Sequence, residues 1–151
     1  MPARETMSIE QCNCFTVRRA ARQITRLYDE HLHSTGLRIT QFLTLATINE
    51  LKSVAINELA ERLDIERTAM GKMASSLERD GCVKISQSPA DGRNRILELT
   101  SEGAALLRRA HPLWIGAQRE FARLNGAERV GAIRQNLADM AIGGGVARTP
   151  D

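Results

Sequence analysis

The chain has 151 residues, 42% of them apolar and 26% charged, which suits one packed domain or one domain with an appended helix pair. No apolar run is long enough for a transmembrane helix, and the N-terminus lacks the apolar core of a secretory signal, so we expect a cytoplasmic protein without a membrane partner. The odd cysteine count of three favours a reducing compartment. Only three of the 21 basic residues are lysine, and arginine suits contacts to phosphate and guanine.

Apolar spacing predicts two helices in the first third of the chain. The first covers residues 14–32, with an apolar residue at every third or fourth position (Cys14, Val17, Ala21, Ile24 and Tyr28). A break at Gly36 follows. A second helix is expected after Thr40, a fair N-cap, with Phe42, Leu45, Ala46 and Ile48 on its apolar side.

The next two predicted helices are short and close together. Ile56, Leu59, Ala60 and Leu63 form the core face of the first. The second runs from Arg67 to a stop at Gly81, with Met70, Met73 and Leu77 facing the core. Its opposite face carries Thr68, Lys72, Ser75 and Arg79. Such a pair, with a small-polar and basic outer face on the second helix, indicates a helix-turn-helix.

The pattern then changes to that of a β-hairpin followed by helices. "CVKISQS" and "NRILELT" alternate, with Val83, Ile85 and Gln87 on one strand face, Ile96 and Leu99 on the returning strand, and the tip at "PADGR". Thr100 is the expected N-cap of a long helix that ends at Asn125-Gly126, and a last helix carries Val130, Ile133, Leu137 and Met140. The fold class is therefore mostly α with a small β-hairpin wing.

A hairpin directly after the second helix indicates a winged helix-turn-helix. The recognition helix would offer Thr68, Lys72 and Ser75 to the major groove, and the wing would bring Arg93 and Arg95 to phosphate or the minor groove. Asp91 repels phosphate, so we interpret it as an intramolecular partner that holds an arginine in place.

The sequence resembles the MarR family of transcriptional regulators (multiple antibiotic resistance regulators). The resemblance lies in "LRITQFLTLATI", "INELAERLDIERTAMGKMASSLERDGCV" and, most specifically, "SPADGRNRILELTSEG". It implies one domain over residues 1–143, with a DNA-binding lobe at about 40–100, dimerisation helices at about 10–33 and 101–141, and a flexible tail at 144–151. It implies DNA contacts by Arg67, Thr68, Gly71, Lys72, Ser75, Arg93 and Arg95, with Asp91 supporting the wing.

The resemblance also implies the partners. We expect a homodimer on a pseudo-palindromic operator in double-stranded DNA, acting as a repressor that a small ligand, such as a phenolic or other aromatic acid, releases. The chain departs from the family at Glu66, a poorer N-cap than the usual Ser or Asp, and at Gly71, where a side chain often reaches a base.

Residues that could carry other chemistry are few. His31, His33 and His111 lack metal-site spacing, and no catalytic triad, phosphate-binding glycine loop or carboxylate pair is present, so we expect no metal, no cofactor and no enzyme. A protein adaptor that uses the helix-turn-helix without DNA is the rival from another class.

The cysteines leave one alternative open. Cys82 is expected to pack in the core and Cys12 to lie on the surface. Cys14 lies where the family's organic-peroxide sensors carry their reactive thiol, and Tyr28 matches one of the tyrosines near it. Phe42 replaces another tyrosine, which removes a hydroxyl. Cys14, Tyr28 and Phe42 are thus candidates for a redox site or an effector pocket.

Overall fold

The computed structural model describes residues 7–140. Its elements in chain order are a 3-10 turn η1 (Ile9–Gln11), α1 (Asn13–Leu32), η2 (His33–Thr35), α2 (Ile39–Leu51), β1 (Ser53–Ala55), α3 (Ile56–Arg62), α4 (Arg67–Arg79), β2 (Val83–Gln87), β3 (Arg95–Leu99), α5 (Ser101–Asn125) and α6 (Ala127–Ala138). The predicted class, mostly helical with a small sheet, is confirmed. The predicted tail at 144–151 lies outside the described residues.

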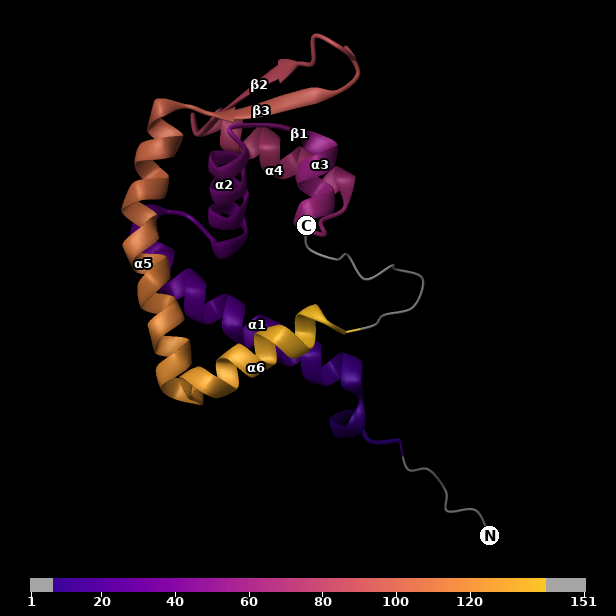
Figure 1. Ribbon diagram of the computed structural model, residues 1–151, viewed down its shortest axis with the longest axis vertical. Helices are drawn as coiled ribbons and strands as arrows, with labels where there is room; N and C mark the ends of the chain where they lie inside the picture. Colours follow the sequence, from indigo (N-terminus) through magenta and orange to yellow (C-terminus); the bar gives the residue numbers. More distant parts are fainter. Residues whose placement is uncertain (1–6, 141–151) are drawn as a thin grey trace.

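The long helix α5 joins two parts of the molecule (Figure 1). The lobe formed by α2, the sheet, α3 and α4 lies at its beginning, and α1 and α6 lie towards its end. We call α1, α6 and the second half of α5 the helical arm. No helix among residues 7–140 is long and apolar enough to cross a membrane.

The start of α2 differs from the prediction. Thr40 was expected to be the N-cap, but the helix already begins at Ile39. The carboxylate of Asp29, on α1, accepts a hydrogen bond from the Ile39 N–H at 2.8 Å, and Gln41 Oε1 accepts one from the Arg38 N–H at 2.9 Å. The expectation for Thr40 was wrong because a side chain from another helix satisfies the free amide.

The sheet has three antiparallel strands in the order β1-β3-β2, one more than the predicted hairpin. The added strand, β1, is three residues long and pairs with β3 through Val54 opposite Leu97. The register of β2 and β3 places Ile85 opposite Leu97 and Val83 opposite Leu99. Leu97 is fully buried, so the core residue of β3 is Leu97, whereas the sequence analysis had emphasised Ile96 and Leu99.

The core lies inside the lobe and continues along α5. Its fully buried large side chains are Leu32, Leu45, Ile48, Val54, Leu59, Met70, Leu77 and Leu97. The arm is packed differently, because α6 contains no buried residue. Most of the exposed large apolar side chains lie on the arm or just before it: Met7, Ile9, Val17, Leu124, Leu137 and Met140.

Candidate DNA-binding surface

Helix α4 has two clearly different faces. Met70, Ala74 and Leu77 are buried against the core, as the spacing predicted for Met70 and Leu77. On the opposite side Arg67, Thr68, Lys72 and Ser75 are exposed and Gly71 is half-buried. These five predicted DNA-binding residues therefore form one solvent-facing stripe, which we call the α4 stripe.

The end of α4 is joined to the wing by a contact that the sequence analysis missed. The Glu78 carboxylate accepts a hydrogen bond from the Ile85 N–H at 2.9 Å. Ile85 lies on β2, which is an edge strand, so its outward amide has no partner strand. The bond holds β2 against the helix that carries the α4 stripe. Glu78 follows Lys72 and Ser75 on the helix, but no local pattern shows that it reaches the sheet.

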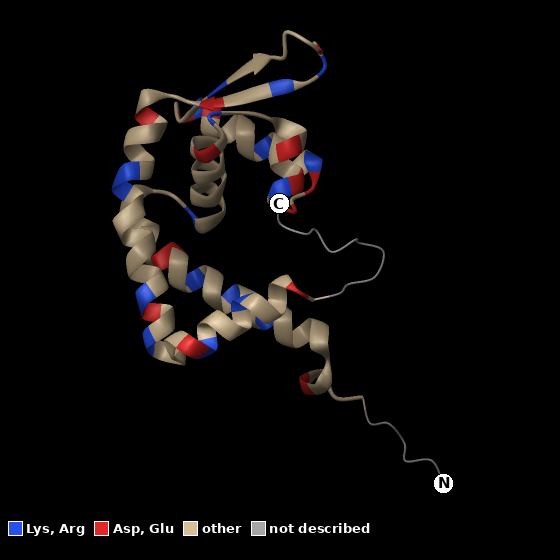
Figure 2. Cartoon of the chain, viewed as in Figure 1, with Lys and Arg blue, Asp and Glu red and all other residues tan. Residues whose placement is uncertain are grey.

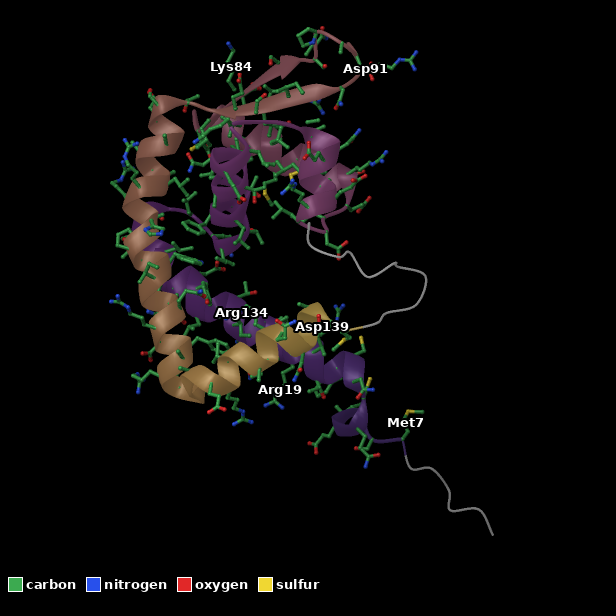
Figure 3. The ribbon with its side chains drawn as sticks, viewed as in Figure 1. Met7, Arg19, Lys84, Asp91, Arg134 and Asp139 are labelled. Carbon is green, nitrogen blue, oxygen red and sulfur yellow. The ribbon has the colours of Figure 1, made fainter. Side chains whose placement is uncertain are left out.

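The wing loop spans residues 88–94. Asp91 Oδ1 accepts a hydrogen bond from the Arg93 N–H at 3.1 Å, and the Asp91 carbonyl accepts one from the Asn94 N–H at 3.0 Å. Asp91 was predicted to hold an arginine in place, and its carboxylate contacts the backbone of Arg93. The side chains of Arg93 and Arg95 are exposed. Figure 3 shows Asp91 at the tip of the wing, away from Lys84.

Charge is distributed over both ends of the molecule (Figure 2). Basic residues are coloured on the wing and on the helices of the lobe beneath it. A second basic group lies on α1, where Arg18, Arg19, Arg22 and Arg26 are all exposed. Because α1 lies at the far end of α5, these arginines are separate from the α4 stripe and the wing.

The three candidate redox or effector residues do not meet within one chain. Tyr28 lies fourteen positions after Cys14 on α1, which is roughly 21 Å along a helix. Cys12 is the N-cap of α1, and its Sγ accepts a hydrogen bond from the Phe15 N–H at 3.5 Å. Cys12 and Cys14 are both exposed. Within one chain, Cys14 therefore lies at the opposite end of α1 from Tyr28.

Tyr28 and Phe42 instead attach α1 and α2 to α5. The Tyr28 hydroxyl donates a hydrogen bond to Gln118 Oε1, and burial raises the pKa of Tyr28. Phe42 stacks on Trp114 with ring centroids 5.8 Å apart and 20° between the planes, and His111 stacks on Trp114 at 5.8 Å. Phe42 is buried, so its aromatic ring serves the packing of α2 on α5.

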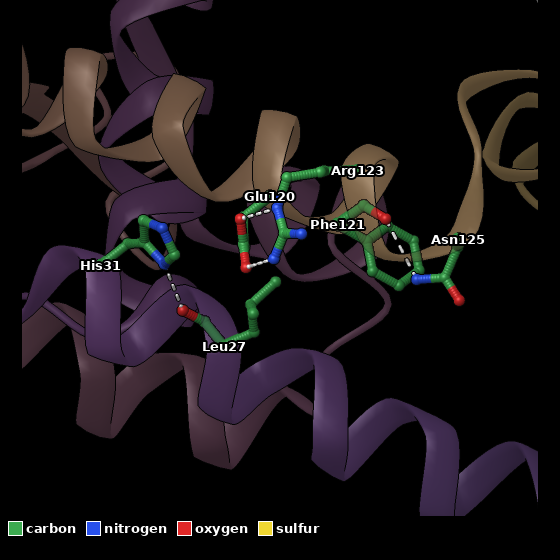
Figure 4. Close-up of polar contacts among 6 residues, drawn as sticks. All are labelled: Leu27, His31, Glu120, Phe121, Arg123 and Asn125. Atoms are coloured by element: carbon green, nitrogen blue, oxygen red, sulfur yellow. Dashed lines mark hydrogen bonds and ion pairs between the residues drawn. The ribbon is translucent and has the colours of Figure 1, made fainter.

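Polar contacts at the seam between α1 and α5 involve His31, Glu120 and Arg123. His31 Nδ1 bonds to the Leu27 carbonyl at 2.9 Å (Figure 4). Glu120 binds Arg123 through two hydrogen bonds of 2.9 and 2.7 Å, and these, with His31 nearby, lower the pKa of Glu120. Within residues 7–140 no three His, Cys, Asp or Glu side chains gather in a metal-binding group.

A surface hollow of about 530 Å³ lies at the junction between α1 and α2. It is lined by Asp29, Glu30, His33, Gly36, Leu37 and Arg38. Arg38 forms a 3.8 Å ion pair with Asp29, the residue that caps α2. The hollow therefore lies at the point where the arm meets the lobe, and both charged and apolar groups line it.

Cys82 is buried at the base of the wing, as expected of a core cysteine. Burial, with Asp80 and Glu102 nearby, raises the pKa of the Cys82 thiol. Its carbonyl accepts a hydrogen bond from the Thr100 N–H at 3.1 Å. Thr100 is the N-cap of α5, as predicted, and its hydroxyl oxygen accepts from the Gly103 N–H at 3.0 Å.

Comparison with known proteins places these features in one family. Residues 37–94 match the model of the MarR family, a stretch that includes α2, α3, α4 and the wing loop. The crystal structure of the M. tuberculosis transcriptional regulator MosR in complex with DNA is 40% identical, with a TM-score of 0.78 over 85% of this chain and 92% of that one.

Two more distant relatives also match this chain. The organic hydroperoxide resistance transcriptional regulator of Bacillus subtilis is 25% identical over 104 residues, which are 69% of this chain and 71% of that protein. A mutant MarR from E. coli, solved with operator DNA, is 24% identical with a TM-score of 0.75 over 81% of this chain and 88% of that chain, and so has the same fold. The chain belongs to the MarR family, and it is a DNA-binding transcriptional regulator, not an enzyme.

Proposed function

We propose that this regulator is a homodimeric repressor of the cytoplasm that occludes a pseudo-palindromic operator and leaves it when a small ligand binds. The observation that carries the proposal is the arrangement of the lobe. The exposed α4 stripe and the exposed wing arginines are joined by the bond between Glu78 and Ile85. One rigid unit would then enter the major groove and contact the flanking backbone.

The arm supports the dimer. Leu124, Leu137 and Met140 are 57%, 49% and 48% exposed, and α6 buries none of its side chains. Exposed large apolar side chains at both ends of α6 suit a surface that another chain covers. A second copy is the natural occupant, because a two-fold dimer would present two recognition helices to successive major grooves.

The residues on α4 and those on the wing are expected to make different contacts with DNA. Lys72 and Ser75 lie on the α4 stripe and would reach base edges, where a good contact contributes about 1–3 kcal/mol of discrimination. Arg93 lies on the wing loop, where it would contact phosphate without reading sequence.

A salt titration tests the DNA-binding part. The affinity for a duplex selected by the wild-type protein should fall steeply with salt concentration. Arg93→Ala should weaken binding about equally on all duplexes and reduce the salt slope by about one. Lys72→Ala should in addition change which bases are preferred. A DNA affinity that depends on neither salt concentration nor sequence would favour the hypothesis of a protein adaptor over that of a repressor.

The junction of arm and lobe supports the ligand-release mechanism. The hollow at Asp29 and Arg38 adjoins the start of α2, and the Phe42–Trp114 pair fastens α2 to α5. A ligand at this junction would favour one spacing of the two recognition helices over the other. An aromatic acid would place its carboxylate at Arg38 and its ring against Leu37, which also lines the hollow.

Trp114 makes this part measurable, because it is the only tryptophan of the chain. Titration with aromatic acids such as salicylate should change Trp114 fluorescence and raise the melting temperature while operator affinity falls. Arg38→Ala should weaken the response to the acid and leave operator affinity unchanged without it. Equal responses of wild type and Arg38→Ala to the acid would show that the ligand does not bind at this hollow.

A second candidate mechanism is thiol-based peroxide sensing at Cys14. Two observations favour it: Cys14 lies exposed in the first turn of α1, and a relative is an organic hydroperoxide resistance regulator. The thiolate sulfur would attack the outer, OH-bearing peroxide oxygen and form an S–O bond as the O–O bond breaks. The sulfur is oxidised to a sulfenic acid, and the alkoxide that leaves takes a proton from water to become an alcohol.

Two serine variants separate the mechanisms. If Cys14 is the sensor, Cys14→Ser should keep its operator affinity in organic hydroperoxide, whereas wild type loses affinity. Cys12→Ser is the matched control, since Cys12 is the neighbouring exposed thiol. A normal peroxide response in Cys14→Ser would exclude Cys14 as the sensor.

A further inference from the structure

Gly71 lies in the interior of the recognition helix, which is an unfavourable place for glycine. Helix α4 runs from Arg67 to Arg79, so Gly71 has more than a turn of helix on either side. Glycine is the poorest helix residue after proline, because it loses the most backbone freedom on folding. Thr68 and Ser75 lie three and four residues away, so Gly71 is at the centre of the α4 stripe.

Nothing inside the chain requires glycine at this position. Its φ is not among the positive values, which occur instead at Gly36, Gly81 and Gly126. A Cβ built on Gly71 meets no atom within 4 Å, whereas a Cβ on Gly103 would collide with the Cys82 carbonyl. An alanine would therefore fit the folded chain without strain and improve the helix.

The other helices support the same reading. Among the helical glycines of the described residues, a Cβ built on Gly116 would lie 3.4 Å from His31 Cδ2, whereas a Cβ on Gly131, like one on Gly71, would meet nothing within 4 Å. Gly131 lies on α6, the surface that a second copy would cover. The two helical glycines whose Cβ would meet nothing, Gly71 and Gly131, thus lie on helices that the proposed function assigns to contacts with another molecule.

We propose that Gly71 is a specificity-determining residue whose missing side chain lets the α4 backbone approach the base edges of the major groove. A Cβ at this point would hold the helix away from the bases. The side chains of Thr68 and Ser75 are short, so their contacts with base edges depend on a close approach of the helix. This inference rests on the proposed function, since it needs α4 in the groove.

The test uses Gly71→Ala in the full chain, with two measurements that should move in opposite directions. The melting temperature should rise by about 2–4 °C, because alanine favours the helix. Affinity for a duplex selected by the wild-type protein should fall roughly ten-fold or more, as expected for a lost base contact. Affinity for an unrelated duplex at the same salt should change less than about two-fold, because phosphate contacts dominate it.

The control is Asn49→Ala on α2, which also replaces an exposed, poor helix former by alanine. It should raise the melting temperature and leave both affinities unchanged, which separates a general stabilisation from a lost approach. If the wild-type protein binds its operator with sequence preference and Gly71→Ala binds it equally well, the inference about Gly71 is overturned and the proposed function stands. A wild-type protein without any sequence preference would overturn the proposed function and the inference with it.

Discussion

Gly103→Ala should damage the joint between the wing and α5. Gly103 lies in the first turn of α5, and a Cβ there would lie 1.9 Å from the Cys82 oxygen and 2.8 Å from the Cys82 carbonyl carbon. An ordinary contact needs at least 3.4 Å, so the two segments must separate by about 1.5 Å, the difference between these distances. The obstacle is backbone on both sides and cannot be relieved by a rotamer change.

The cost can be estimated from the contacts at the joint. Overpacking of this kind costs about 1–3 kcal/mol. The movement also breaks the hydrogen bonds from the Thr100 N–H to Cys82 and from the Thr100 hydroxyl to Gly81, each contributing about 1 kcal/mol. Alanine returns about 1 kcal/mol through better helix propensity. The free energy of unfolding should therefore fall by about 2–4 kcal/mol.

Urea unfolding followed by far-UV circular dichroism measures this change. Protein concentration must be equal in all samples, because a dimer's apparent stability depends on it. Gly71→Ala is the internal comparison: the same chemical change is made in a helix where the Cβ meets nothing, so stability should rise. A Gly103→Ala protein as stable as wild type would refute the reasoning from the 1.9 Å contact.

Three further outcomes are expected. Lys52→Gly should raise the free energy of unfolding by about 1 kcal/mol in the same assay, because Lys52 has φ 68° and ψ −52°, a strained conformation for a residue with a Cβ. A lower free energy of unfolding in this variant would contradict the argument from strain. In a titration with a thiol reagent at pH 8, Cys82 should react roughly ten-fold slower than Cys12 and Cys14, because Cys82 is buried and its raised pKa leaves less thiolate. Equal reaction rates of the three cysteines would contradict the burial of Cys82. Glu78→Ala should speed hydrogen exchange at the Ile85 amide, whereas Glu78→Gln should not, because glutamine keeps an acceptor oxygen. Equal exchange rates in wild type and both variants would show that the hydrogen bond does not persist in solution.

The main elements of the fold followed from local patterns in the sequence. The apolar spacing on α4, the strand alternation around "PADGR" and the Thr100 cap depend on residues within a few positions of one another, and all three are present in the structure. The exposure of the α4 stripe followed in the same way, because burial of Met70 and Leu77 turns the opposite face to solvent. Local sequence therefore determined which side chains α4 exposes to solvent.

The tertiary structure alone decided how the elements are held together. Asp29 caps α2 from ten residues upstream, β1 joins the sheet through β3, and Tyr28 bonds to Gln118 ninety residues away. A three-residue strand has too short a pattern to recognise, and a carboxylate or hydroxyl looks the same in sequence whether it faces solvent or a distant backbone amide. The same holds for the two glycines. Only the space around Gly71 and Gly103 shows that one faces outward from the chain and the other lies against the Cys82 carbonyl.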